Sequence, residues 1–226
     1  MRWLKVGCAV ALLFVGIMGF LHTAAGRPLL AALGVGCPGK NVSPSEVEAM
    51  RQRGLTALRG TERAASRPAF GLVLDESREF QVVAWAAARG LTCTQAERPT
   101  RRLSCQDVPS SALQPTVPGG TAVAFDEVNF TFFPDGRLLG VETLRRKLTA
   151  DAAARLFGEI TARLNAQVGR PTERTGDASA AYLNGGAAHT AFARYRYADY
   201  LATVTAMNLV GRVALREQYQ SAVGPG

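Results

Sequence analysis

Three kinds of apolar pattern follow one another along the chain. A run without charged residues extends from Val6 to Leu21. Further on, apolar residues recur at helical spacing in some segments and at alternate positions in others. The helical segments are residues 43–58, 75–90 and 149–168, and the strand-like segments are 127–133, 137–146, 191–197, 200–207 and 212–220. Single helices alternating with runs of antiparallel strands predict an α+β protein.

Local signals mark the ends of these elements. Ser43-Pro44-Ser45-Glu46 is a capping box with proline at the first helical position, and Gly60 ends that helix. Pro134-Asp135-Gly136 predicts the turn of a hairpin, and Gly169-Arg170-Pro171 stops the last helix. The apolar segment 70–74 predicts a strand or an extended lead-in. We expect five segments: a targeting segment 1–26, a linker with a helix 27–68, two α+β units 69–148 and 149–220, and a tail 221–226.

The two α+β units are predicted to be tandem copies. A shift of 75 residues carries the helix 75–90 onto 150–165. The same shift carries Gly136-Arg137 onto Gly211-Arg212, and Glu142 onto Glu217. Each unit therefore reads as a helix followed by strands that end in a Gly-Arg hairpin.

The amino terminus has the pattern of an export signal. Arg2 and Lys5 precede the apolar run, and small residues follow it at 23–26. Cleavage there, an uncleaved membrane anchor, and a lipoprotein acylated at Cys37 are three open alternatives. We expect the rest of the chain to be free in the periplasm, to be anchored to a membrane and face the periplasm, or to be secreted. The membrane is expected as a partner only through the N-terminal segment.

An oxidising compartment predicts a disulfide between Cys93 and Cys105. Both cysteines have strand-like apolar flanks, and the polar residues between them indicate a turn. A metal site is the rival interpretation, but the chain beyond the signal has one histidine, His189, and no Cys-x-x-Cys. We therefore expect no metal and no cofactor.

Charge and motifs argue against several functional classes. The chain carries a formal net charge of +8, which favours acidic partners or anionic lipid. Nucleic acid is not expected as a partner, because no basic-aromatic motif is present and the compartment is wrong. A nucleophilic enzyme needs a positioned base, and His189 lies in a glycine-rich loop without a neighbouring carboxylate in sequence. We expect no enzyme activity; an enzyme of unrecognised type that uses His189 and nearby carboxylates remains an alternative.

The segment 192–200 holds the candidate interaction residues. Strand alternation places Arg194 and Arg196 on one face, and Tyr195 and Tyr197 on the other. Arginine and tyrosine are enriched at binding hot spots, so Arg194, Arg196 and Tyr200 are the candidates. The simpler interpretation is a half-buried strand with the tyrosines inward and the arginines in water.

The helix exit Leu164-Asn165-Ala166-Gln167-Val168-Gly169-Arg170-Pro171, followed by aromatic strands, resembles known envelope proteins. It is similar to the SmpA-type outer-membrane assembly lipoproteins and to the tandem-domain β-lactamase inhibitor protein. Residues 72–77, before the first repeated helix, are similar to their lead-in, although Asp75 stands where those families have glycine. The resemblance implies a periplasmic protein-binding module. Our first hypothesis is an envelope interaction or assembly module that acts through sheet-surface contacts. A structural or sensory ectodomain is the other non-enzymatic alternative.

Overall fold

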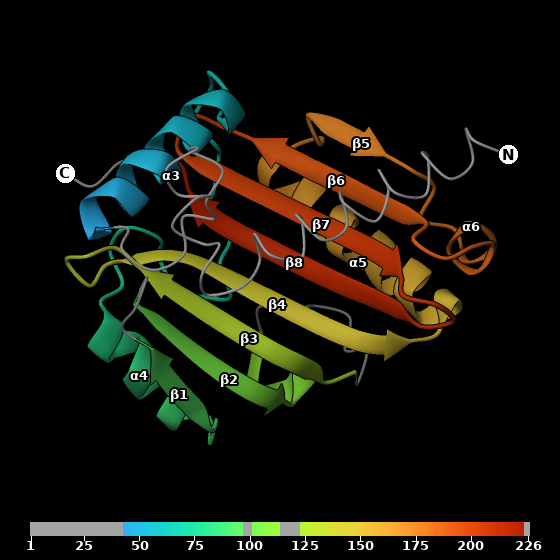
Figure 1. The fold of residues 1–226 in the computed structure, drawn as a ribbon, viewed down its shortest axis with the longest axis horizontal. Coiled ribbons are helices and arrows are strands. Elements are labelled where there is room, and N and C mark those ends of the chain that lie inside the picture. Colours follow the sequence, from blue (N-terminus) through green and yellow to red (C-terminus); the bar gives the residue numbers. More distant parts are fainter. Residues whose placement is uncertain (1–42, 97–100, 114–122, 224–226) are drawn as a thin grey trace, which may run out of the picture. The chain divides into compact units, whose positions relative to one another are not determined.

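A computed structural model describes residues 43–96, 101–113 and 123–223 as one mixed α and β structure with a single antiparallel sheet of eight strands (Figure 1). The expected targeting segment and Cys37 lie outside the described residues. No helix within the described ranges is long and apolar enough to cross a membrane. The elements are α3 (Pro44–Leu58), α4 (Glu79–Ala87), β1 (Cys93–Ala96), β2 (Arg102–Val108), a 3-10 turn (Ser110–Leu113), β3 (Phe125–Phe132), β4 (Leu138–Leu148), α5 (Ala150–Val168), β5 (Glu173–Thr175), α6 (Ala180–Asn184), β6 (Thr190–Arg196), β7 (Tyr200–Asn208) and β8 (Val213–Ser221).

The sheet consists of two meanders joined side by side. Its strand order is β1-β2-β3-β4-β8-β7-β6-β5, so β4 and β8 pair antiparallel at the centre and the short strands β1 and β5 form the two edges. Each meander follows one long helix in the chain, α4 in the first half and α5 in the second. Short edge strands offer few unpaired backbone groups to other chains.

The two central hairpins keep the offset of 75 residues. Gly136 turns β3 into β4 with φ 83°, and Gly211 turns β7 into β8 with φ 82°. Both positions need the left-handed conformation that glycine adopts without strain. The register of the first hairpin shifts next to Phe132, whereas the β7–β8 register runs without interruption.

That irregularity separates two residues that the sequence repeat aligns. The side chain of Glu142 accepts hydrogen bonds from the side chains of Arg216 and Gln218 on one side of the sheet. Glu217 is 1% exposed and lies on the opposite side, in register with the buried Leu215 and Tyr219. One extra residue in a strand turns all later side chains to the other face, so equivalent positions in the two halves have different environments.

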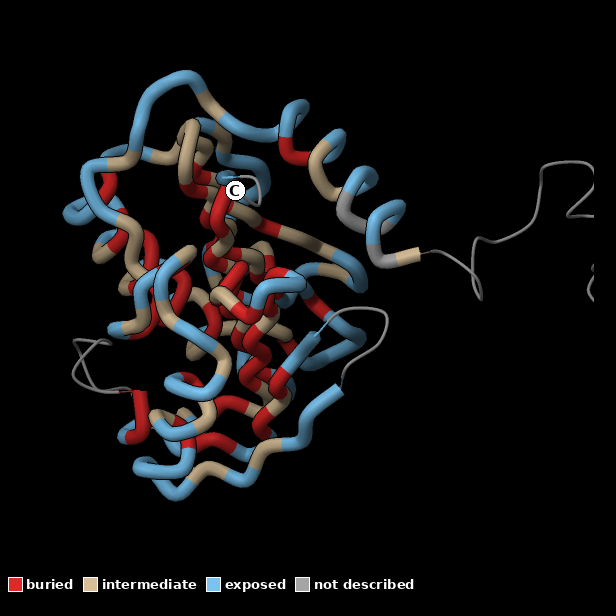
Figure 2. The backbone as a smooth tube through the Cα atoms, turned by 90° about the vertical axis from the view of Figure 1, so that its left-hand side faces the viewer, coloured by how far each residue is buried: buried red, intermediate tan, exposed pale blue. Residues whose placement is uncertain are grey.

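One face of the sheet is covered by helices. On this covered face α5 packs against β7 and β8 through Leu156, Phe157, Ile160 and Leu164, which are all buried. The hydroxyl of Thr149 accepts a hydrogen bond from the Ala152 amide and caps the start of α5. Helix α4 contributes Trp85, whose ring meets Phe130 of β3 edge to face at 5.6 Å. Figure 2 shows the buried positions gathered in the interior, with exposed positions mainly around them.

Residues 60–77 connect α3 to the covered face without forming the expected strand. The amide of Gly60 donates to the Tyr197 carbonyl, and the Ala198 amide donates to the Glu62 carbonyl. Beyond Pro68 the chain enters the core, where Phe70 contacts Phe125 and Tyr219. The prediction of a strand over 70–74 is wrong, because Phe70 and Gly71 have positive φ and the segment turns under the sheet.

Helix α3 lies over one end of the opposite face (Figures 1 and 2). Its only buried side chain among those described is Leu55, and the Arg51 guanidinium stacks over Phe133 at 4.9 Å. Phe133 and Leu139 are buried but belong to no part of the main core. Among the described helices, α3 covers only one end of this face (Figure 1).

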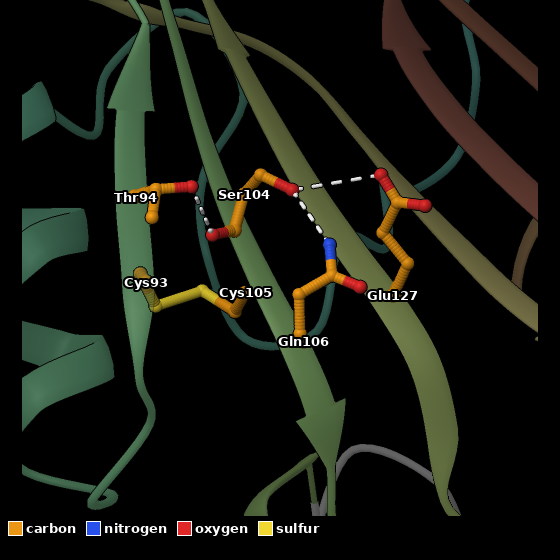
Figure 3. The surroundings of a disulfide bond; sticks show 6 residues. All are labelled: Cys93, Thr94, Ser104, Cys105, Gln106 and Glu127. Atoms are coloured by element: carbon orange, nitrogen blue, oxygen red, sulfur yellow. Dashed lines mark hydrogen bonds between the residues drawn. A yellow bond between two sulfur atoms is a disulfide. The ribbon is translucent and has the colours of Figure 1, made fainter.

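The disulfide between Cys93 and Cys105 is confirmed as a bond between neighbouring strands. The two residues are directly opposite in the β1–β2 ladder, with their Cα atoms 4.0 Å apart. Figure 3 shows the bond beside Ser104, whose hydroxyl contacts Gln106 and Glu127. Cys105 is fully buried, so the bond fastens the edge strand to the core.

Candidate functional site

The strongest candidate site is the side of the sheet that faces away from α4 and α5, which we name the open sheet face. It consists of the strand positions that alternate with those on the covered face. These positions include Arg102, Ser104, Glu127, Asn129, Thr131, Gly140, Glu142, Leu144, Arg146, Glu173, Phe192, Arg194, Arg196, Leu201, Thr203, Thr205, Arg216, Gln218 and Gln220. An antiparallel sheet commonly keeps one face solvated, so the argument depends on what this face carries.

The first cluster on the open sheet face joins β5 and β6. Arg194 Nη1 lies 2.9 Å from Glu173 Oε2, and Arg196 Nη2 lies 2.5 Å from the same oxygen. The two arginine side chains are 29% and 30% exposed. One carboxylate therefore holds two partly exposed guanidinium groups, and its one shared oxygen cannot satisfy all of their donors.

The second cluster surrounds Glu127 on β3. Arg146 Nη2 lies 2.9 Å and Arg102 Nη2 lies 3.5 Å from its carboxylate, and the Asn129 amide donates to it at 2.8 Å. The hydrogen bond from Asn129 and the charges of both arginines hold the pKa of Glu127 below its usual value, against a smaller opposing effect of burial. The carboxylate is thus ionised at neutral pH and fixes both guanidinium groups.

The third cluster lies at the centre of the sheet. Glu142 Oε2 accepts from Arg216 Nη2 at 2.7 Å and from Gln218 Nε2 at 3.1 Å. A shallow groove of about 120 Å³ beside it is lined by Thr131, Gly140 and Gln220 among others. A Cβ at Gly140 would lie 2.9 Å from the Tyr219 carbonyl oxygen, so only glycine permits the close approach of β4 to β8 here.

These three clusters give the open sheet face an excess of positive charge. They contain five arginines and three glutamates, which is an excess of two positive charges. All five guanidinium groups are between 29% and 49% exposed. Guanidinium groups with free donors in a fixed orientation can bind carboxylates in the two-pronged way, so the face is chemically suited to an acidic surface.

The structure places the predicted site residues differently from one another. Arg194 and Arg196 lie together on the open sheet face. Tyr200 is fully buried, with its hydroxyl donating to the Pro68 carbonyl at 2.8 Å, so it is not a surface residue and we withdraw it as an interaction candidate. Tyr195 is also buried, and its hydroxyl donates to Asn165 Oδ1 at 2.9 Å. Burial raises the pKa of Tyr195 to about 12.

The remaining candidate chemistry has an ordinary structural role. His189 Nδ1 lies 2.7 Å from the Tyr182 carbonyl oxygen, and its ring stacks on Tyr182 at 4.5 Å. Tyr182 lies in α6, and His189 lies between α6 and β6. Within residues 43–96, 101–113 and 123–223, no group of three or more His, Cys, Asp or Glu side chains is arranged to hold a metal ion.

Sequence reasoning missed a further charged cluster, which lies on the covered face and is separate from the three on the open sheet face. Glu217 pairs there with Arg145 and Arg163, and the Tyr219 hydroxyl donates to it at 2.6 Å. A signal was present in the sequence, because Glu217 alternates in its strand with Val213, Leu215 and Tyr219, which share its buried side. A carboxylate at such a position requires buried partners.

Comparison with known protein families, curated proteins and solved structures finds no match for this chain.

Proposed function

We propose that this chain is an exported envelope protein that binds an acidic protein partner across its open sheet face. The observation that carries the proposal is the set of three carboxylate-anchored arginine clusters, spread across the sheet from β2 to β5. Among the helices that the structure describes, none covers this whole face (Figure 1). Binding residues on strands are held more firmly than residues on loops. The partner is an acidic polypeptide, because the excess guanidinium groups need carboxylates to complete their hydrogen bonding.

The disulfide supports the location in this proposal. A bond between Cys93 and Cys105 fits an oxidising compartment, which agrees with the export pattern of the amino terminus. We propose a periplasmic location, either free or anchored to a membrane by the first segment. The two halves act in this proposal as tandem helix-plus-sheet units that build one wide binding face, as in the envelope proteins that the sequence resembles.

The test compares one double variant and two single variants with wild type. The measurement is how much of each crosslinked envelope partner every variant captures. Arg194→Gln with Arg196→Gln removes one cluster, and Arg216→Gln removes the cation of the central cluster. Arg155→Gln is the matched control, because Arg155 lies on the outside of α5 and is 53% exposed. We expect the first two variants to lose the partner that wild type captures, and the control to retain it.

Purified partner then gives the affinity. Removing a hot-spot arginine costs about 2 kcal/mol or more, so we expect a loss of roughly 30-fold or more, together with weaker wild-type binding at high salt. The proposal fails if the partner binds all variants equally, or if its binding surface is not acidic. Thermal melts within a few degrees of wild type confirm that the variants are folded.

A further inference from the structure

A cavity on the covered face lies beside the buried charged cluster. It has a volume of about 250 Å³ and lies between α5 and residues 68–71. Its wall includes the apolar Phe70 and Leu164 and the polar Arg163, Gln167 and Tyr219. The volume is below the roughly 300–1,000 Å³ of sites for drug-sized ligands, so a ligand of this cavity must be small.

The polar wall belongs to a network that is centred on Glu217. Arg145 Nη1 lies 2.7 Å from Glu217 Oε1, and Arg163 Nη2 lies 3.3 Å from Oε2. The Thr143 hydroxyl also donates to Oε1, at 3.3 Å. Arg145 is 3% exposed and stacks on the Phe125 ring at 3.7 Å. It does not line the cavity.

This network contains more positive than negative charge. Burial by itself raises the pKa of Glu217, but the charges of Arg145 and Arg163 and the bond from Tyr219 outweigh burial and lower it. Burial and the neighbouring Glu217 raise the pKa of Tyr219 well above its ordinary value, so its phenol is neutral. Two guanidinium groups thus share one carboxylate, and one positive charge has no counterion among the described residues of the network.

Arg163 is the residue through which that charge reaches the cavity. Its side chain is 13% exposed, compared with 3% for Arg145. Its hydrogen bonds to Glu217 and Tyr219 both leave from Nη2, so its other nitrogens remain donors for a ligand. A buried charge without a counterion is unfavourable, and an anion in the cavity would supply that counterion.

We propose that this cavity binds a small organic monocarboxylate, with its carboxylate on Arg163 and its apolar body against Phe70 and Leu164. The single excess charge selects a monoanion over a dianion. The apolar part of the wall selects an organic acid over an inorganic ion. This site lies on the opposite side of the sheet from the open sheet face and does not depend on the protein-binding proposal.

The test is a titration of the exported protein with benzoate, followed by amide NMR signals. Benzamide has the same shape without the charge, and phenyl phosphate has the same ring with a phosphate group. We expect saturable binding of benzoate, at least tenfold weaker binding of benzamide, and no tighter binding of phenyl phosphate. The shifted amides should include those of Gly71 and Gln167, which line the cavity.

Three variants locate the binding. Arg163→Met should weaken benzoate at least tenfold, whereas Arg155→Met on the same helix should change it by less than twofold. Gln167→Trp fills the exposed side of the cavity without altering a charge, and it should also abolish binding. If Arg163→Met does not fold, the Gln167→Trp result decides alone. The proposal is overturned if benzoate does not bind, or if benzamide binds as tightly as benzoate. It is also overturned if phenyl phosphate is the one ligand that binds, or if the Gln167→Trp variant binds benzoate as wild type does.

Discussion

The two faces of the sheet use the same trio of side chains in opposite environments. On the open sheet face, Glu173 holds Arg194 and Arg196, and the three side chains are 29–37% exposed. On the covered face, Glu217 holds Arg145 and Arg163, and the three side chains are 1–13% exposed. Water screens the first trio, so its pairing contributes little to stability and its arginines remain usable by a partner. The charged groups of the second trio are buried away from water, so their stability depends on their pairing with one another.

The largest expected effect follows from breaking the buried trio. Glu217→Gln leaves two buried guanidinium groups without their carboxylate, and removing one partner of a buried pair costs about 3–5 kcal/mol. Glu173→Gln is the matched change on the open sheet face, and there we expect about 0–1 kcal/mol. Urea unfolding of both variants measures the difference. Equal losses would contradict the assignment of the two trios to different roles.

The disulfide comes next in magnitude. Replacing Cys93 and Cys105 by alanine opens a loop with a sequence separation of 12 residues, which should lower the free energy of unfolding by about 3 kcal/mol. The disulfide lies at the β1 edge, at the other end of the sheet from β6. Its loss should therefore leave capture of the partner through Arg194 and Arg196 intact. Loss of capture in a folded variant would instead show that the binding surface extends to β1.

Acid should weaken the buried trio. The folded-state pKa of Glu217 lies below its ordinary value of 4.5, so this group stabilises the fold fully above pH 4.5. That contribution disappears as pH falls through the lower folded pKa. The difference in unfolding free energy between wild type and Glu217→Gln should therefore shrink below pH 4.5. A difference that stays constant to the lowest pH would show that folding does not lower the pKa of Glu217.

Sequence periodicity predicted the elements that have an amphipathic pattern long enough to read. Helix α5 and the hairpins β3–β4 and β7–β8 lie where their apolar spacing and turn glycines place them. Strand β5 was missed because it has three residues, and with it Glu173, the partner of both candidate arginines. The apolar segment 70–74 was misread because a buried irregular segment and a strand have the same composition.

The buried partners of Glu217 could not be identified from the sequence because the three residues of the trio are far apart in the chain. Arg145, Arg163 and Glu217 come from β4, α5 and β8. The pairing of β4 with β8 and the packing of α5 against β8 bring them together. The sequence repeat aligned Glu217 with Glu142, but a register shift in the first hairpin places Glu142 on the open sheet face. Such a shift depends on local packing, which periodicity does not report.

The smallest expected change in stability belongs to the candidate interaction residues. Arg194→Gln with Arg196→Gln removes only exposed ion pairs, so the melting temperature should stay within a few degrees of wild type. Tyr195→Phe, on the other side of the same strand, loses the buried hydrogen bond to Asn165 and should cost about 1 kcal/mol. Calorimetry of both variants checks the assignment of the two strand faces. The reverse order of stability would mean that the faces are exchanged.

Site-specific photocrosslinking tests the central claim most directly. A crosslinking side chain at Thr203 or Thr205, in the middle of β7 on the open sheet face, should capture the partner in intact cells. The same group at Arg155, on the exposed side of α5, should not. Addition of Arg194→Gln and Arg196→Gln should abolish the capture from Thr205. Capture from Arg155 alone, or capture from Thr205 that the arginine changes do not affect, would contradict binding through the arginine clusters of the open sheet face.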